Sequence, residues 1–173
     1  RFEPVVLKNL IDRDGDAANN GIGFGKPAKD LSVNFVPVPY PDYPPAIIRI
    51  KPQERQLWRV LNASAITYLN LAVLFRHAPQ RLGLVAIDCV PMDRRHGTTA
   101  AITWVDHIGI PPGARVEFVL RGPPLAVPAL LVTRTVDTGQ GGENDPNRAL
   151  ARLVADPDAP DAPSHLPAQS TPL

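Results

Sequence analysis

The stretch YLNLAVLF, residues 68–75, carries the pattern that decides the fold class. Large apolar side chains occupy every second position, which are Leu69, Leu71, Val73 and Phe75. A period of two places these side chains on one face of an extended strand, with the intervening residues on the other face. We therefore predict a β-strand here, with one face buried in a core.

The same period recurs on both sides of this stretch. In RVEFVLR, residues 115–121, Val116, Phe118 and Leu120 share one face, and in RQLWRVLN, residues 55–62, Trp58 and Val60 do so. Further short apolar runs end at Pro, Gly, Asn or Asp clusters, and they lie at 4–11, 46–50, 81–87, 107–110, 129–135 and 149–155. Many short strands at this spacing, with no amphipathic helix, predict an all-β antiparallel sandwich or barrel.

Length and composition limit the possible functions. The 173 residues fit one domain, and a net charge of +1 with no basic stripe argues against nucleic acid as the main partner. No run reaches the ~18 apolar residues that a membrane span requires, so we expect no membrane partner. Proline is abundant, with 21 residues, and proline breaks helix interiors, which again favours strands and turns.

Composition also divides the chain. Residues 1–156 are expected to form one domain, and the Pro-rich residues 157–173 a linker or tail that packs weakly on it. Polar, Gly-rich segments at 12–30 and 137–148 are expected to be loops. The chain begins at Arg1 without a signal peptide, which we interpret as an excised fragment or a processed chain. A single cysteine leaves the redox compartment open.

Three short motifs resemble functional sites, but each is better interpreted as an ordinary structural feature. DRDGD (12–16) resembles the start of a calcium loop, but the sixth and twelfth positions, where such a loop has Gly and Glu, are Ala17 and Gly23. GIGFGKP (21–27) lacks the residue spacing of a phosphate loop. The sequon Asn62-Ala63-Ser64 is interpreted as a strand-end asparagine that bonds nearby backbone rather than as a glycosylation site.

The segment AIDCVPMDRRH, residues 86–96, holds three potential ligands of a blue-copper site. A blue site needs two histidines and a cysteine that converge, with a distant methionine. Here Cys89, Met92 and His96 follow one another in an order unusual for such a site, and the other histidines, His77, His107 and His165, are isolated. We therefore predict no catalytic, cofactor-binding or metal-binding residue in this chain.

Several segments together resemble the second, middle cupredoxin-like domain of a three-domain multicopper oxidase of the laccase or copper-resistance type. They are PVVLKNLIDRDGD (4–16), LSVNF (31–35), PAIIRIKPQE (45–54), LWRVLNASA (57–65), LVAIDCVPM (84–92) and VDHIGIPPGARVEFVL (105–120). Phe35, Gln53 and Cys89 replace glycines of the family pattern. Because glycine serves turns with positive φ, these three turns are expected to differ in conformation.

The resemblance implies a cupredoxin-like Greek-key sandwich without copper ligands of its own. The segment would be a non-catalytic structural and docking domain, and its partners would be the flanking cupredoxin domains. The parent chain would hold copper and oxidise phenolic, organic or metal substrates with O2 in the periplasm or outside the cell. Exposed apolar surface for docking or self-association is expected at VPVPYPDYPP (36–45) and PPLAVPA (123–129). The alternatives are a free-standing module that binds a protein or glycan through loops 12–30 and 137–148, and a small blue-copper electron carrier.

Overall fold

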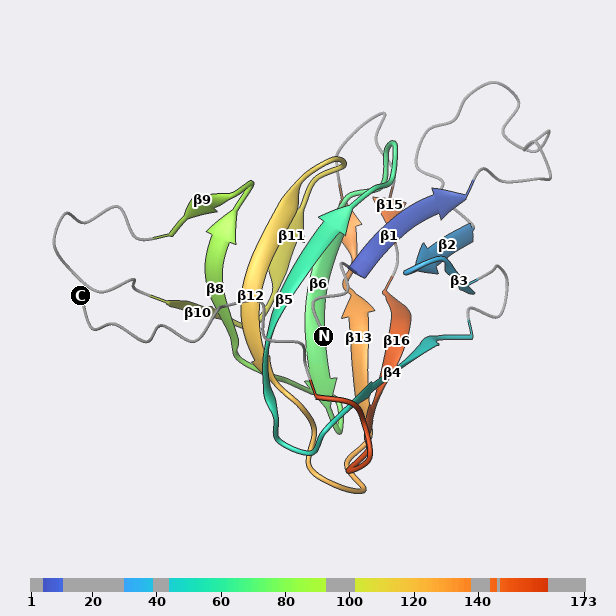
Figure 1. The fold of residues 1–173 in the computed structure, drawn as a ribbon. Helices are drawn as coiled ribbons and strands as arrows, with labels where there is room; N and C mark the ends of the chain where they lie inside the picture. Colours follow the sequence, from blue (N-terminus) through green and yellow to red (C-terminus); the bar gives the residue numbers. More distant parts are fainter. Residues whose placement is uncertain are drawn as a thin grey trace, which may run out of the picture.

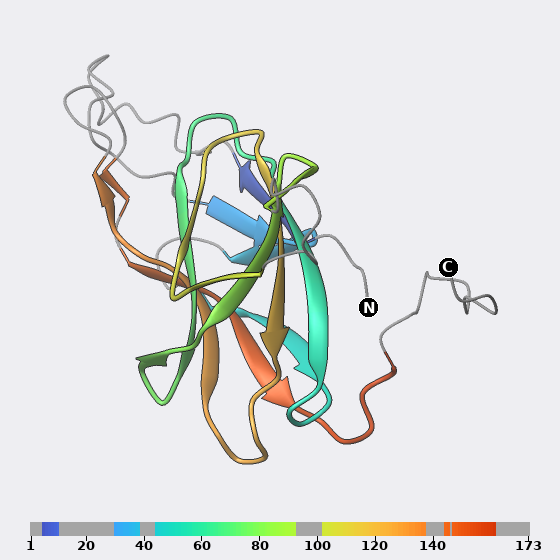
Figure 2. The same ribbon diagram turned by 90° about the vertical axis from the view of Figure 1, so that its left-hand side faces the viewer.

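The structure is a computed structural model, and it describes residues 5–10, 30–38, 44–92, 102–137, 144–145 and 147–161. Every regular element in these residues is a β-strand. The described residues therefore hold no helix that could cross a membrane. The strands form two large sheets that lie face to face, as Figures 1 and 2 show from two sides.

The first sheet, sheet A, has eight strands. Along the sheet they are β10 (Thr103–Val105), β8 (Leu82–Ile87), β12 (Arg115–Arg121), β5 (Arg55–Asn62), β1 (Val5–Leu10), β2 (Asp30–Val33) and β3 (Val36–Val38), while β9 (Val90–Pro91) pairs with β8. β5 and β12 pair over seven residues and form the centre of this sheet.

The second sheet, sheet B, has six strands. Their order is β11 (Ile108–Ile110), β6 (Leu69–Phe75), β13 (Ala129–Thr133), β16 (Arg148–Ala155) and β4 (Ala46–Ile50), while β7 (Ala78–Pro79) pairs with β6. A separate hairpin joins β14 (Val136–Asp137) to β15 (Asn144–Asp145). Two of the described strand pairs are parallel, β1 with β5 and β16 with β4, and the others are antiparallel. The predicted all-β sandwich is therefore confirmed, with a parallel pair in each of its two sheets.

The core lies between the sheets and consists of the residues that the alternation selects. Leu69, Leu71 and Val73 are buried, and Phe75 is partly buried against the same cluster. From the opposite sheet come the buried side chains Trp58, Val60, Val116, Phe118 and Leu120. The predicted inner faces are therefore confirmed for all three strands, and the burial of these side chains supplies the main stabilising free energy.

The three turns in which glycine is replaced nevertheless keep the left-handed conformation. Asn34 and Phe35 have φ of 49° and 67°, and Asp88 and Cys89 have 47° and 65°. Each pair forms the two-residue loop of a hairpin, β2–β3 and β8–β9, so both are type I′ turns. Gln53, with φ of 58°, follows Pro52 in a turn of type II. The expectation that these turns differ in conformation is therefore wrong.

Candidate functional site

The turn that carries Cys89 is fixed by its neighbour Asp88. The Asp88 carboxylate accepts a hydrogen bond from the backbone nitrogen of Arg115 at 2.8 Å, and the Asp88 nitrogen donates to the Arg115 carbonyl at 2.8 Å. These bonds tie the end of β8 to the start of β12. The Cys89 thiol is exposed at the tip of the turn, outside the core.

The other candidate copper ligands do not gather around Cys89. Met92 is half-buried and packs against the hydrophobic core. His77 lies in the turn between β6 and β7, before β8 begins, whereas Cys89 follows the end of β8. A six-residue strand, roughly 20 Å long, therefore separates the imidazole from the thiol.

His107 is placed by the register of β10. Val105, two residues before it, pairs with Leu82 at the beginning of β8, and the chain then crosses to sheet B. The His107 ring contacts the Asp106 carboxylate at 2.6 Å, and this hydrogen bond lowers the pKa of Asp106. His96 and His165 lie outside the described residues. The described histidines thus do not form, with Cys89 and Met92, the ligand set of a blue-copper site.

Across the described part of the chain, no group of three or more His, Cys, Asp or Glu side chains could hold a metal ion.

The sequon asparagine is a structural residue. Asn62 is fully buried, and its Nδ2 donates to the carbonyl oxygens of Thr67 at 2.8 Å and Ile110 at 2.9 Å. Its Oδ1 accepts a hydrogen bond from the Ser64 hydroxyl at 2.6 Å. The interpretation of Asn62 as a strand-end asparagine that bonds backbone is confirmed.

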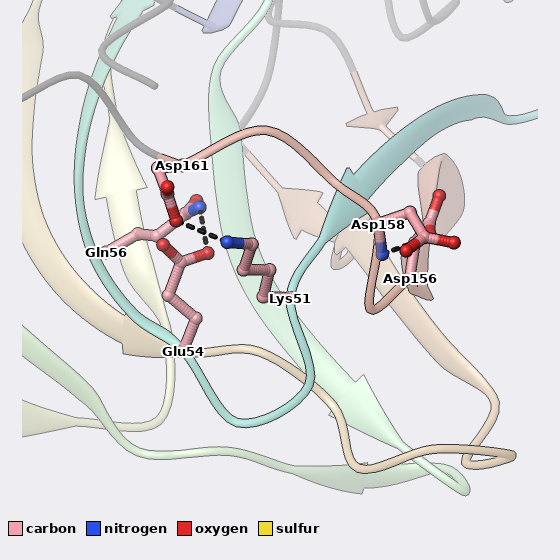
Figure 3. Close-up of polar contacts among 6 residues, drawn as sticks. All are labelled: Lys51, Glu54, Gln56, Asp156, Asp158 and Asp161. Atoms are coloured by element: carbon pink, nitrogen blue, oxygen red, sulfur yellow. Dashed lines mark hydrogen bonds and ion pairs between the residues drawn. The ribbon is translucent and has the colours of Figure 1, made fainter.

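The C-terminal end of the described chain packs on the domain. Residues 156–161, which we call the C-terminal strap, follow β16, and the nitrogen of Asp156 donates to the Ile50 carbonyl at 2.9 Å. Ala159 is buried, and the Lys51 ammonium pairs with the Asp161 carboxylate (Figure 3). This hydrogen bond lowers the pKa of Asp161 and raises that of Lys51.

The strap bears on the expectation of weak packing from residue 157 onward. Ala159 is buried, whereas residues 157, 158, 160 and 161 are exposed and Asp161 makes a surface pair with Lys51, so weak packing stays a prediction. Residues 162–173 lie outside the described residues. The division into a domain at 1–156 and a linker at 157–173 stays a prediction.

A groove lies between the two edge strands β3 and β4, where both sheets end. Its volume is about 450 Å3, and the side chains that line it include Val33, Val36, Ile47, Ile48, Trp58 and Pro160. Ile47 and Val36 remain exposed, by 61% and 49%. Exposed apolar surface therefore occurs beside the Pro-rich insert, although residues 39–43 of that insert lie outside the described residues.

Two side-chain hydrogen bonds run from the groove towards the strap and end at Glu54. The indole nitrogen of Trp58 donates to the Gln56 side-chain oxygen at 2.9 Å, and the Gln56 amide donates to the Glu54 carboxylate at 2.8 Å. Figure 3 shows Glu54 and Gln56 beside the Lys51–Asp161 pair. The second predicted apolar segment, 123–129, exposes Leu125 by 58% but buries Pro123.

With this geometry the chain is a cupredoxin-like Greek-key sandwich. No family model matches the sequence, and no curated protein matches it. Solved multicopper oxidases share the fold. A variant of McoA from Aquifex aeolicus is similar with a TM-score of 0.65 and 15% identity over 88% of this chain, which is 31% of that protein.

Two further oxidases extend the comparison. A multicopper oxidase from Campylobacter jejuni, described as a metallo-oxidase, gives a TM-score of 0.59 and 18% identity over 100% of this chain and 34% of its own. The laccase-like CueO of Ochrobactrum sp. gives a TM-score of 0.56 and 20% identity, over 94% of this chain and 35% of its own. This chain therefore spans about a third of the length of each of these proteins.

Proposed function

We propose that this chain is a structural and docking domain of a multicopper oxidase, in the middle position, and that it carries no catalytic residue of its own. The observation that supports this most is the comparison with solved oxidases, in which nearly the whole chain corresponds to about a third of each protein. The complete chain would oxidise phenolic, organic or metal substrates with O2. Its compartment would be periplasmic or extracellular.

Copper would then belong to the parent oxidase and be held by other parts of it. Among the described residues the donor set does not support a blue site, because Cys89 follows the end of β8, whereas His77 precedes that strand and His107 follows β10, which pairs with the beginning of β8. The domain's own contribution would be a rigid sandwich with exposed apolar surface, such as the groove at Val36 and Ile47. Flanking cupredoxin domains would cover that surface, and an isolated domain would self-associate through it.

The test is to express the complete reading frame and compare it with residues 1–173 alone. We expect flanking segments with His-x-His pairs on both sides, bound copper, and O2 consumption with a phenol or a reduced metal ion. The segment alone should show neither bound copper nor turnover. As a matched control, Cys89→Ser in the complete protein should leave the copper content unchanged. A reading frame without His-x-His pairs outside this segment would contradict the proposal.

The two alternatives have less support from the described residues. The loops of a free-standing binding module, 12–30 and 137–148, lie almost wholly outside them. An electron carrier would need two histidines beside Cys89, and the strand order separates the two described histidines, His77 and His107, from it.

A further inference from the structure

The outer face of sheet A is unusual for the exposed side of a sandwich. Alternation turns one set of side chains of β5 and β12 away from the core, and these are Arg55, Leu57, Arg59, Leu61, Arg115, Glu117, Val119 and Arg121. These outward positions therefore include four arginines and one glutamate, although the net charge of the whole chain is only +1. The face is turned towards the viewer in Figure 1.

Two of these arginines lie directly opposite one another. Arg55 of β5 and Arg121 of β12 are cross-strand partners, and both are exposed. Like charges at directly opposite positions destabilise a sheet. Arg59, by contrast, pairs with its partner Glu117 at 3.1 Å. The Arg55–Arg121 pair thus costs stability in the isolated domain, and an anionic partner would offset that cost.

An apolar row crosses the same face next to this pair. The register places Trp104 opposite Gly83, Gly83 opposite Val119, and Val119 opposite Leu57. The Trp104 ring covers Gly83, because a Cβ built there would lie 3.2 Å from the indole. Trp104 is nevertheless 49% exposed.

The apolar row continues to the edge of the sheet. Ile102, which also lies against Gly83, extends this row and is exposed by 42%. The outward face of a solvated sandwich is expected to be polar. Aromatic residues and arginine are the residues enriched at protein–protein interfaces. Arginine also forms paired hydrogen bonds with carboxylates.

From these observations we propose that the outer face of sheet A is a docking surface for an acidic protein surface with an apolar centre. This inference rests on the proposed function, since the partner is taken to be another part of the parent chain. Arg55 and Arg121 would bind its carboxylates, and Trp104, Val119 and Leu57 would contact its apolar centre.

A polyanion fits this face less well. Glu117 places a carboxylate at its middle and already neutralises Arg59. The described face offers one aromatic ring rather than a series of stacking platforms. A phosphate backbone would also leave the apolar row in contact with water.

The experiment compares the complete chain with residues 1–173 by covalent labelling and mass spectrometry. Phenylglyoxal reports arginine exposure, and hydroxyl radicals report Trp104. We expect labelling of Arg55, Arg121 and Trp104 to fall several-fold in the complete chain, with no comparable fall at Arg152, which is exposed on β16 of sheet B. The double variant Arg55→Glu/Arg121→Glu should restore Trp104 labelling, whereas Arg152→Glu should not.

Other results would overturn the inference in distinguishable ways. If Trp104 and both arginines label equally in the two proteins while Ile47 in the β3–β4 groove becomes protected, the domain docks through the groove, and only this inference fails. If no surface becomes protected, the proposed function fails too. Salt-sensitive binding of residues 1–173 to oligothymidylate or to phosphatidylglycerol vesicles, with Trp104 unprotected in the complete chain, would assign the face to a polyanion or a membrane instead.

Discussion

Asn62 and Ile110 join the two sheets of the sandwich. The Asn62 amide, at the end of β5 in sheet A, donates a 2.9 Å hydrogen bond to the Ile110 carbonyl, at the end of β11 in sheet B. The Asn62 backbone is anchored as well, because its nitrogen donates to the Ala114 carbonyl and its carbonyl accepts from the Gly113 nitrogen. One buried residue therefore holds three segments together at this end of the core.

Replacement of Asn62 should be among the most damaging single changes in the domain. Asn62→Ala removes the side-chain donor to the buried Ile110 carbonyl, one of the two donors to the Thr67 carbonyl, and the acceptor of the Ser64 hydroxyl, so we expect a loss of about 2–4 kcal/mol. Urea unfolding followed by tryptophan fluorescence measures it. Asn147→Ala is the control, since Asn147 is exposed and accepts one bond from Thr135, and should cost below about 1 kcal/mol. Equal effects would refute the structural role of Asn62.

The turn Lys51-Pro52-Gln53-Glu54 offers a stabilising change. Its Gln53 has φ of 58°, whereas Gly113 serves the same position, with φ of 80°, in the turn Pro111-Pro112-Gly113-Ala114. A side chain is disfavoured at such φ values. Gln53→Gly should therefore stabilise by about 0.5–1 kcal/mol and Gly113→Gln destabilise by a similar amount. Thermal unfolding of both variants measures this, and shifts of the same sign would contradict the assignment.

Gly122 should tolerate no side chain. A Cβ there would lie 2.7 Å from the carbonyl oxygen of Lys51, which is backbone and cannot swing away. Gly122→Ala is expected to cost about 1–3 kcal/mol in chemical unfolding. At Gly109 the three atoms nearest to a Cβ all belong to the Tyr68 side chain, with the hydroxyl at 2.6 Å, and a side-chain rotation relieves this contact. Gly109→Ala should thus be nearly neutral, and a large loss there would show that Tyr68 is rigid.

The longer strands could be predicted from the sequence because each repeats its period of two several times. β6 and β12 were located in this way, and their buried faces agree with the structure. The two-residue strands β7 and β9 show no period, so no pattern indicates them. β3 contains Pro37, which cannot donate a ladder bond, and it lies at the edge of the sheet, where proline is tolerated.

The surfaces could not be predicted because they depend on register. Arg55 and Arg121 are 66 positions apart in the printed sequence, and only the pairing of β5 with β12 makes them neighbours. No basic stripe is visible along the chain for this reason. The groove likewise forms where the edges of two sheets meet. The order of Cys89, Met92 and His96 argues against a blue site from the sequence alone, and because His96 lies outside the described residues this stays a prediction.

The Lys51–Asp161 pair should be visible in a titration. Pairing stabilises the charged Asp161 carboxylate, so the midpoint of its titration should lie below the ordinary value of 3.8. Lys51→Met should raise that midpoint. NMR of the carboxyl carbon measures the Asp161 midpoint in the wild type and the variant. Arg49→Met is the control, because it removes the residue that pairs with Asp156, and it should leave the Asp161 midpoint unchanged. The stability that Asp161 contributes is present above pH 3.8 and is lost as the pH falls through its lowered pKa. An unchanged Asp161 midpoint in Lys51→Met would show that the pair does not form in solution.

Finally, residues 1–173 should bind no blue copper. A blue site needs a thiolate and two imidazoles within bonding distance of one ion. Cys89 is exposed at the end of β8, His77 precedes that strand by a turn, and Met92 packs on the core. Stoichiometric Cu(II) should therefore give no intense thiolate-to-copper band in the visible spectrum, and wild type and Cys89→Ser should give the same spectrum. An intense band that Cys89→Ser abolishes would mean that His96 or His165 reaches the turn, and it would favour the electron-carrier function over the scaffold.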